Sequence, residues 1–119
     1  MRKALIMLAM LLACPISAQQ QATSASGAVL RTLDKLTGRT LDVVIASGRT
    51  ESVGNLKVVL ADCRFPAGNP AGDAYAALEI SEVGQAGVLF SGWMIASAPA
   101  LNALEHSRYD VWVIRCTTS

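Results

Sequence analysis

The chain has 119 residues, which is room for one domain, because domains usually need about 100 to 150 residues to enclose a core. Its ten basic and nine acidic residues nearly balance, and no lysine or arginine cluster follows the first residues. This composition excludes a protein that binds nucleic acid through a basic surface. The hydrophobic fraction of 52% is high for a soluble protein, and much of the excess lies at the very start of the chain.

The first eighteen residues have the form of a secretory signal peptide. Arg2 and Lys3 precede an apolar run from Ala4 to Ala13, and small residues end the segment at Ala18. The run has ten residues, whereas a membrane-spanning helix needs about 20. We therefore expect export to the periplasm, cleavage after Ala18 and no transmembrane span in the mature chain. Its net charge is then about −1, because the two basic residues of the leader are removed.

Cys14 offers a second interpretation of the leader. Leu11-Leu12-Ala13-Cys14 also resembles the lipobox at which bacterial lipoproteins are cut and acylated. Three features favour ordinary cleavage: Leu12 stands where a smaller residue is usual, Pro15 follows the cysteine directly, and a conventional cleavage site lies just beyond. The mature N-terminus distinguishes the two routes, because it is either a free Gln19 or an acylated Cys14.

The folded domain is expected to begin after a short polar segment. Residues 19–27 carry no charge and no apolar periodicity, which is typical of a disordered leader. We expect a single β domain over residues 28–119. Its longest irregular stretch is Pro66–Asp73, where two prolines and two glycines oppose strand pairing.

Short apolar runs alternate with turn residues along the domain, which predicts a mainly β fold. Phe90, Trp93 and Met94 make the fifth run apolar on both faces and predict a central strand. We expect a six-stranded sandwich or barrel-like sheet. The six expected strands are Val29–Asp34, Arg39–Ala46, Leu56–Cys63, Ala74–Glu82, Val88–Ile95 and Asp110–Cys116.

One short helix is expected before the last strand, over Ser97–Glu105. Ser97 can cap it, Pro99 is tolerated in the first turn, and Leu101 and Leu104 recur on one side. A helix of about two turns is held by packing, so both leucines are expected to lie on the sheet.

Cys63 and Cys116 are the thiols of the folded domain, and they allow one intramolecular pairing. Disulfides form and persist in the compartment to which the leader directs the chain. A bridge between them would stabilise the fold by about 4 kcal/mol on the chain-entropy model. Two alternatives remain, a pair of buried free thiols and a redox-active pair. The absence of a Cys-x-x-Cys motif opposes the second.

His106 is the only histidine, so any Ser-His-Asp or Cys-His chemistry must use it. No Gly-x-Ser-x-Gly motif is present. We expect His106 to end the short helix and to hydrogen-bond a carbonyl there. One histidine beside two paired sulfurs cannot supply a zinc site, and the carboxylates lack calcium-loop spacing. The sequence therefore predicts a protein that is not an enzyme, with no catalytic residue, no metal and no cofactor. Loss of a catalytic activity on mutation of His106 would contradict this.

Four of the six aromatic residues lie in the last third of the chain, at Phe90, Trp93, Tyr109 and Trp112. They either form core under the helix or present a docking patch. Tyr109 and Trp112 are the pair expected at the surface, because aromatic anchors at a sheet edge suit protein recognition. The residues predicted to dock a partner protein are thus Trp93, His106, Tyr109 and Trp112.

The segment Phe90–His106, followed by Tyr109-Asp110-Val111-Trp112, resembles the family catalogued as domain of unknown function 2155, found in alphaproteobacteria. Leu33–Gly38 resembles the opening motif of that family, and Cys63 and Cys116 fall where its cysteine pair does. The resemblance covers essentially all of the mature domain. It implies a small exported domain without an established enzyme activity.

Genes of this family often lie close to one for an accessory subunit of respiratory complex I. The resemblance therefore implies a periplasmic accessory subunit or assembly partner on the outer face of that inner-membrane complex, docking through Gly92–Trp112. The alternative is a free or lipid-anchored envelope protein, unrelated to respiration, that binds another protein or a cell-wall component. A lipidated Cys14 would favour the alternative.

Overall fold

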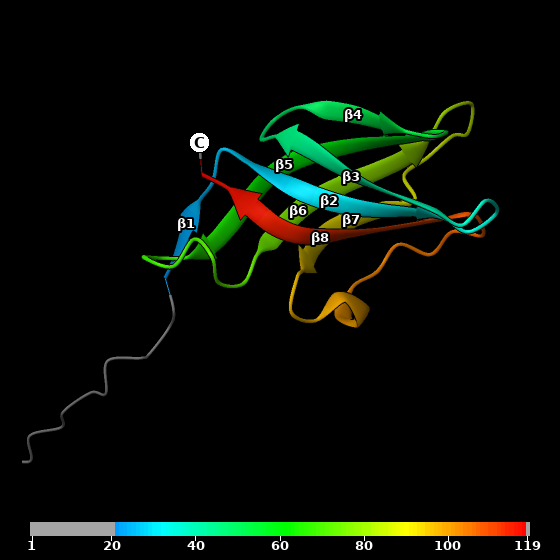
Figure 1. The fold of residues 1–119 in the computed structure, drawn as a ribbon. Helices are drawn as coiled ribbons and strands as arrows, with labels where there is room; N and C mark the ends of the chain where they lie inside the picture. Colours follow the sequence, from blue (N-terminus) through cyan, green and yellow to red (C-terminus); the bar gives the residue numbers. More distant parts are fainter. Residues whose placement is uncertain (1–20, 119) are drawn as a thin grey trace, which may run out of the picture.

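The computed structural model describes residues 21–118, which fold as two antiparallel β-sheets stacked face to face (Figure 1). The predicted signal peptide, its cleavage site and Cys14 lie outside the described residues. The mainly β class is confirmed. The elements are β1 (Ala22–Ser24), β2 (Gly27–Asp34), β3 (Arg39–Ala46), β4 (Thr50–Val53), β5 (Leu56–Pro66), β6 (Tyr75–Glu82), β7 (Phe90–Ile95), the 3-10 turn η1 (Pro99–Leu101) and β8 (Tyr109–Thr117).

The larger sheet has the strand order β1-β5-β6-β7. β1 and β4 both pair with the same edge of β5, β1 near the end of that strand and β4 near its start. The smaller sheet has the order β3-β2-β8. The two sheets do not close into a barrel, so the sandwich is the predicted architecture that forms. All six predicted strands are present with shifted ends, and β1 and β4 are additional.

β1 and β4 form where the sequence carries no strand signal. β1 lies in the expected disordered leader, residues 19–27, of which the structure describes 21–27. There the structure differs from the expectation, because Ala22–Ser24 pairs with Arg64–Pro66. β4 is short and polar at three of its four positions. It is held by the hairpin to β5, whose turn needs Gly54 at a positive φ of 57°.

The core lies between the two sheets and is built from the alternate residues that each strand turns inward. Leu30 of β2, Ile80 of β6 and Val113 of β8 are 0–1% exposed. Burying one such aliphatic side chain stabilises by about 1.5–3 kcal/mol, so this layer holds the sheets together. The other large side chains that are fully buried are Ile45, Leu56, Val58, Leu60, Cys63 and Met94.

β7 lies at the edge of the larger sheet and pairs with β6, so its prediction as a central strand is wrong. Phe90 and Met94 are buried, whereas Trp93 lies on the outer face and is 42% exposed. Val88 and Leu89 precede the strand and are exposed. Apolar side chains thus lie on both faces of β7 because the strand is a partly exposed edge, and not because both of its faces are buried.

The short helical element predicted before the last strand is present, but only as the 3-10 turn η1, which is much shorter than the predicted Ser97–Glu105. Ser97 donates a 2.6 Å hydrogen bond from its hydroxyl to Asp73 instead of capping a helix. Leu104 is buried as predicted, but Leu101 is exposed. So short a segment does not nucleate a helix, and these contacts fix its path. No helix within residues 21–118 is long and apolar enough to span a membrane.

Cys63 of β5 and Cys116 of β8 form the predicted disulfide, with their Cα atoms 5.8 Å apart. Both residues are buried. Because β5 belongs to the larger sheet and β8 to the smaller one, the bond joins the two layers of the sandwich.

Candidate functional site

His106 lies in the loop before β8, with a partner at each ring nitrogen. Its Nδ1 accepts hydrogen bonds from the backbone N–H groups of Arg108 (3.0 Å) and Tyr109 (3.1 Å). Its Nε2 lies 3.3 Å from Oε1 of Glu82. Because Nδ1 accepts twice, the neutral ring carries its proton on Nε2 and donates it to Glu82. The ring thus binds amides and a carboxylate, and not the helix-end carbonyl that the sequence predicts, because η1 ends at Leu101, well before His106.

Ion pairs around His106 fasten the same loop to β2. Arg108 donates two hydrogen bonds to Asp34, at 3.1 and 2.9 Å. These bonds from Arg108 lower the pKa of Asp34 to about 2. Lys35 donates a 2.6 Å hydrogen bond to the carbonyl oxygen of His106 and lies 3.6 Å from Asp110. Through this network, His106 and its neighbours attach the loop before β8 to the rest of the sandwich.

The two tryptophans predicted to dock a partner lie on opposite faces of the sandwich. Trp93 is on the outer face of the larger sheet, and the Arg64 guanidinium lies 5.5 Å from its ring centroid. Trp112 alternates with the buried residues Val111 and Val113, so it points to the outer face of the smaller sheet, where it is partly buried. One partner surface therefore cannot centre on both tryptophans.

The other two predicted docking residues are largely withdrawn from the surface. Tyr109 is 4% exposed, and its hydroxyl oxygen accepts a hydrogen bond from the backbone N–H of Asn55 at 3.3 Å. The side chain of His106 is 11% exposed and packs against the Tyr109 ring. The expectation that Tyr109 is a surface anchor is therefore wrong. Trp93 and Trp112 remain predictions as docking residues.

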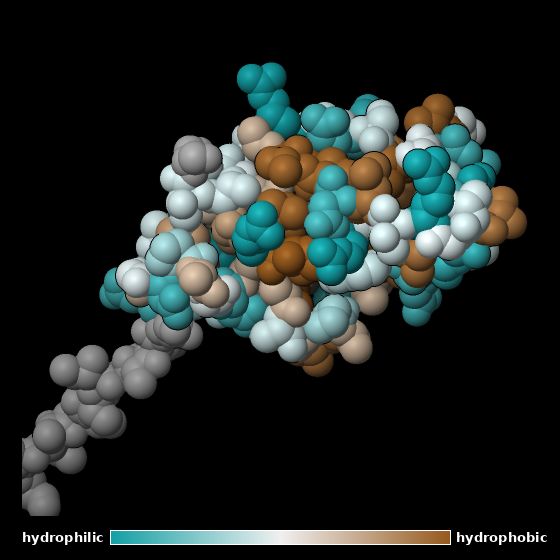
Figure 2. All heavy atoms as spheres, in the orientation of Figure 1, coloured by the Kyte–Doolittle hydropathy of each residue, from teal (hydrophilic) through white to brown (hydrophobic). Residues whose placement is uncertain are grey.

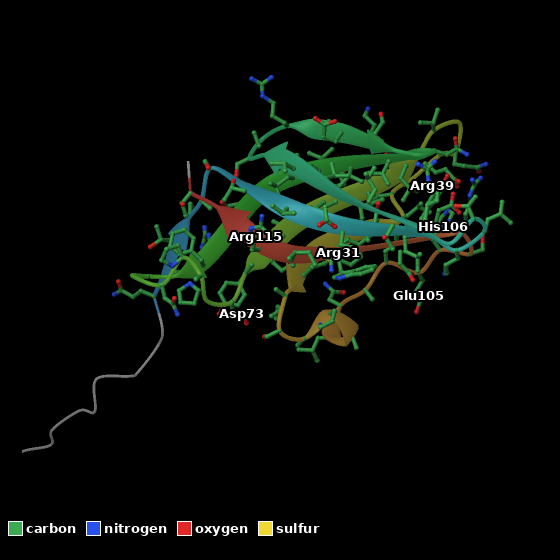
Figure 3. All side chains as sticks on the ribbon, viewed as in Figure 1. Arg31, Arg39, Asp73, Glu105, His106 and Arg115 are labelled. Carbon is green, nitrogen blue, oxygen red and sulfur yellow. A yellow bond between two sulfur atoms is a disulfide. The ribbon has the colours of Figure 1, made fainter. Side chains whose placement is uncertain are left out.

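The outer face of the smaller sheet mixes apolar and charged side chains. Figure 2 shows apolar surface over β2, β3 and β8, crossed by hydrophilic groups. Val44 of β3 is 65% exposed on this face, opposite Val29 of β2. Arg31 and Arg115 also lie here (Figure 3). We call this surface, with the neighbouring edge of β3, the β3 face.

The β3 face carries more positive than negative charge. Arg31 Nε and Asp42 Oδ1 lie 2.8 Å apart, directly opposite each other in the strand register. Hydrogen bonds from Arg31, with smaller electrostatic contributions from Arg31 and Arg115, lower the pKa of Asp42. Within residues 21–118 no carboxylate lies within ion-pair distance of Arg115 or of Arg39 at the start of β3. A complementary surface would therefore be acidic.

β3 is an edge strand of eight residues, six of which are exposed. Its apolar residues include Leu41, which is 62% exposed although it lies on the inward parity of the strand. The register explains this, because Leu41 pairs with Thr32 near the open end of the sandwich. A long, exposed and partly apolar edge strand is a template for pairing with another chain.

A cleft of about 230 Å³ lies beside this strand. Its walls come from β2 and β3 on one side and from the β4–β5 turn and Tyr109 on the other. Leu41 and Val53 give it apolar surface, Arg39 gives it a cationic group, and Asp34, whose carboxylate is paired with Arg108, also lines it. Such a groove can accept an apolar side chain and a carboxylate.

Groups of three or more histidine, cysteine, aspartate or glutamate residues that could hold a metal ion are absent from residues 21–118. Ser97 and Asp110, close to His106 in sequence, have other partners, Asp73 and Lys35.

A family model for an uncharacterised protein conserved in bacteria, domain of unknown function 2155, matches residues 28–116. The chain belongs to this family. A protein of Rickettsia prowazekii (strain Madrid E), named Uncharacterized protein RP359, is 28% identical over 87 residues. The alignment covers 71% of this chain and 56% of that protein, so the chain spans little more than half the length of this relative. No solved structure matches the chain.

The β3 face was missed by sequence reasoning, although one signal of it was present. In Leu41-Asp42-Val43-Val44 the alternation of apolar and polar residues breaks at Val44. Val44 has the parity of Asp42, so an apolar side chain stands on the polar face of the strand. That irregularity indicates exposed apolar surface.

Proposed function

We propose that this chain is a non-enzymatic protein-interaction domain of the bacterial cell envelope, and that the β3 face is its contact surface. One observation carries the proposal: an edge strand of eight residues is exposed at six positions, among them Leu41 and Val44. Proteins usually shorten, charge or cover such an edge, because it otherwise pairs with other chains. An edge left apolar and uncovered is therefore explained by a partner.

Two observations support an envelope location for this function. The leader has the composition of a signal peptide, and the Cys63–Cys116 disulfide suits an oxidising compartment. We accordingly propose that the mature domain works in the periplasm.

Respiratory complex I is the partner that we propose for this module, on the family resemblance alone. Purification of complex I in mild detergent, from cells that carry a tagged copy of the chain, tests this. Co-purification in a fixed ratio to the complex is the expected result. Absence from the intact complex would favour the alternative, a free or lipid-anchored envelope protein that binds elsewhere.

Crosslinking in the native envelope tests the contact surface itself. Val44→Lys places a charge on the β3 face, whereas the matched change Val83→Lys alters a residue of similar exposure (65% against 70%) in the β6–β7 loop. We expect Val44→Lys to abolish crosslinks that the wild-type chain and Val83→Lys both give. Equal crosslinking by the two variants would move the contact away from β3. Failure of the wild-type chain to crosslink any protein would count against an interaction domain.

A further inference from the structure

The backbone of β3 offers a row of unpaired groups along its outer edge. In an antiparallel pair, alternate residues point their N–H and C=O groups toward the partner strand. Leu41 faces β2, because its carbonyl oxygen accepts a hydrogen bond from the Thr32 hydroxyl at 3.0 Å. Thr40, Asp42 and Val44 therefore direct their N–H and C=O groups away from β2. Within residues 21–118 these groups have no backbone partner outside the β2–β3 pair.

Other edge strands of the molecule offer less. β4 is only four residues long, and its exposed residues are polar. β8 has one exposed residue, Arg115. At β7, Asn102 donates a 3.0 Å hydrogen bond from its side chain to the carbonyl oxygen of Trp93, so the loop after the strand occupies its edge. β3 combines length, exposure and free backbone groups.

The surroundings of β3 specify what kind of strand could add to it. Side chains of an added strand would alternate between the cleft and the outer face. Toward the cleft they would meet Leu41, Val53 and Arg39. On the outer face they would lie beside Val44 and Asp42 of β3, while Arg31 and Arg115 extend over this face from β2 and β8. Apolar residues interspersed with carboxylates would complement these contacts.

We infer that β3 is a β-augmentation site, which binds an extended, acidic segment of a partner protein as a fourth strand of the smaller sheet. The segment would span about five residues, a common strand length. Backbone hydrogen bonds to Thr40, Asp42 and Val44 would provide affinity, and the cleft and arginines would provide selectivity. This inference deepens the proposed function and rests on it.

Binding of synthetic peptides to the mature chain tests the inference. The probe is a fluorescent peptide in which valine alternates with glutamate, and its counterpart carries lysine in place of glutamate. We expect the glutamate peptide to bind about tenfold more tightly than the lysine peptide, because Arg39 and Arg115 lack a carboxylate partner in residues 21–118. Equal binding, or none by the glutamate peptide, would overturn the acidic-segment assignment.

Hydrogen exchange and backbone blocking identify the edge. On binding, the amides of Thr40, Asp42 and Val44 should become protected, whereas their β2-facing neighbours should change little. Val44→Pro removes an outward N–H, which an edge strand tolerates, and should weaken binding about tenfold or more. Val44→Thr keeps that N–H and is the matched control. Protection confined to another strand, or equal binding by both variants, would refute the site.

Two further measurements keep the inference testable if Val44→Pro fails to fold. A probe peptide with alternate amides N-methylated should lose binding to the wild-type chain, since it cannot pair with an edge. The mass of the wild-type chain in solution tests the other occupant: a dimer that Val44→Thr preserves and the glutamate peptide cannot displace would assign the edge to a second copy.

Peptide binding at β3 without any native crosslink would refute the proposed cellular function while leaving the edge site intact. A native crosslink that Val44→Pro does not weaken would refute the edge site and leave the proposed interaction function standing.

Discussion

β7 and β3 are both edge strands, but only one of them is covered. The loop that follows β7 returns along it, and Asn102 hydrogen-bonds the Trp93 carbonyl. β3 has no such cover from residues 21–118, and its apolar residues Leu41 and Val44 are exposed. The same fold therefore protects one edge with its own chain and leaves another free. This difference indicates that exposure at β3 is not simply the result of a small domain with too little chain to cover its edges.

The largest expected effect is on the disulfide, which joins the two sheets and involves neither β3 nor β7. Replacement of both Cys63 and Cys116 by serine should lower the free energy of unfolding by about 4 kcal/mol, because the bond closes a loop between residues 53 apart in sequence. Denaturant unfolding of the variant and the wild type measures this. A loss below about 1 kcal/mol would mean that packing alone fixes the two sheets.

The turn beside the cleft should be the next most sensitive position. Gly54 has a positive φ, and an added Cβ would meet the hydroxyl of Tyr109. We expect Gly54→Ala to destabilise by about 2–4 kcal/mol through backbone strain and overpacking. Thermal unfolding checks this, with Gly38→Ala as the control, since that glycine also has a positive φ but nothing near its Cβ position. Equal losses would show that the close approach of Tyr109 is unimportant.

The comparison of edges is tested directly by one substitution on each. Asn102→Ala should destabilise by about 1 kcal/mol, since it removes a hydrogen bond that covers β7. Val44→Lys should change stability by less than about 0.5 kcal/mol, because the side chain is exposed. Chemical denaturation measures both. The reverse order would mean that β3 contributes to the fold and that its exposure needs no partner.

The smallest expected effect is a pH dependence at the open end. Because Arg108 lowers the pKa of Asp34 from 3.8 to about 2, the folded state binds this proton less readily than the unfolded chain. The resulting stability is fully present above about pH 4 and is lost as the pH falls toward 2. Asp34→Asn should reduce the acid sensitivity of the melting temperature in that range. An unchanged profile would contradict the ion pair with Arg108.

Strand positions were predictable because alternation reflects burial of one face, as Leu56, Val58 and Leu60 of β5 show. The order of the strands in each sheet was not predictable, since pairing depends on contacts between segments that are distant in sequence. Trp93 therefore suggested a central strand but lies at an edge. Ala22–Ser24 forms a strand only because β5 offers it an edge.

The candidate site was predictable only in part. Trp112 was expected at the surface, whereas Trp93 was assigned to a central strand and also named as a docking residue; their opposite directions follow from the sheet order. Tyr109 was expected outside because tyrosine suits interfaces, yet its side chain is buried and its hydroxyl oxygen accepts a hydrogen bond from the backbone N–H of Asn55. The free edge of β3 could not be predicted, because an edge is defined by the strand that is missing beside it.

The chain enters the sandwich at β1, which pairs with the last residues of β5, whereas the cleft lies beside the turn before the first residues of β5. With eleven residues, β5 separates these points by about 30 Å. A membrane tether attached ahead of β1 would thus hold the domain at the end opposite the cleft. The cleft would then face away from the membrane, where another protein could reach it.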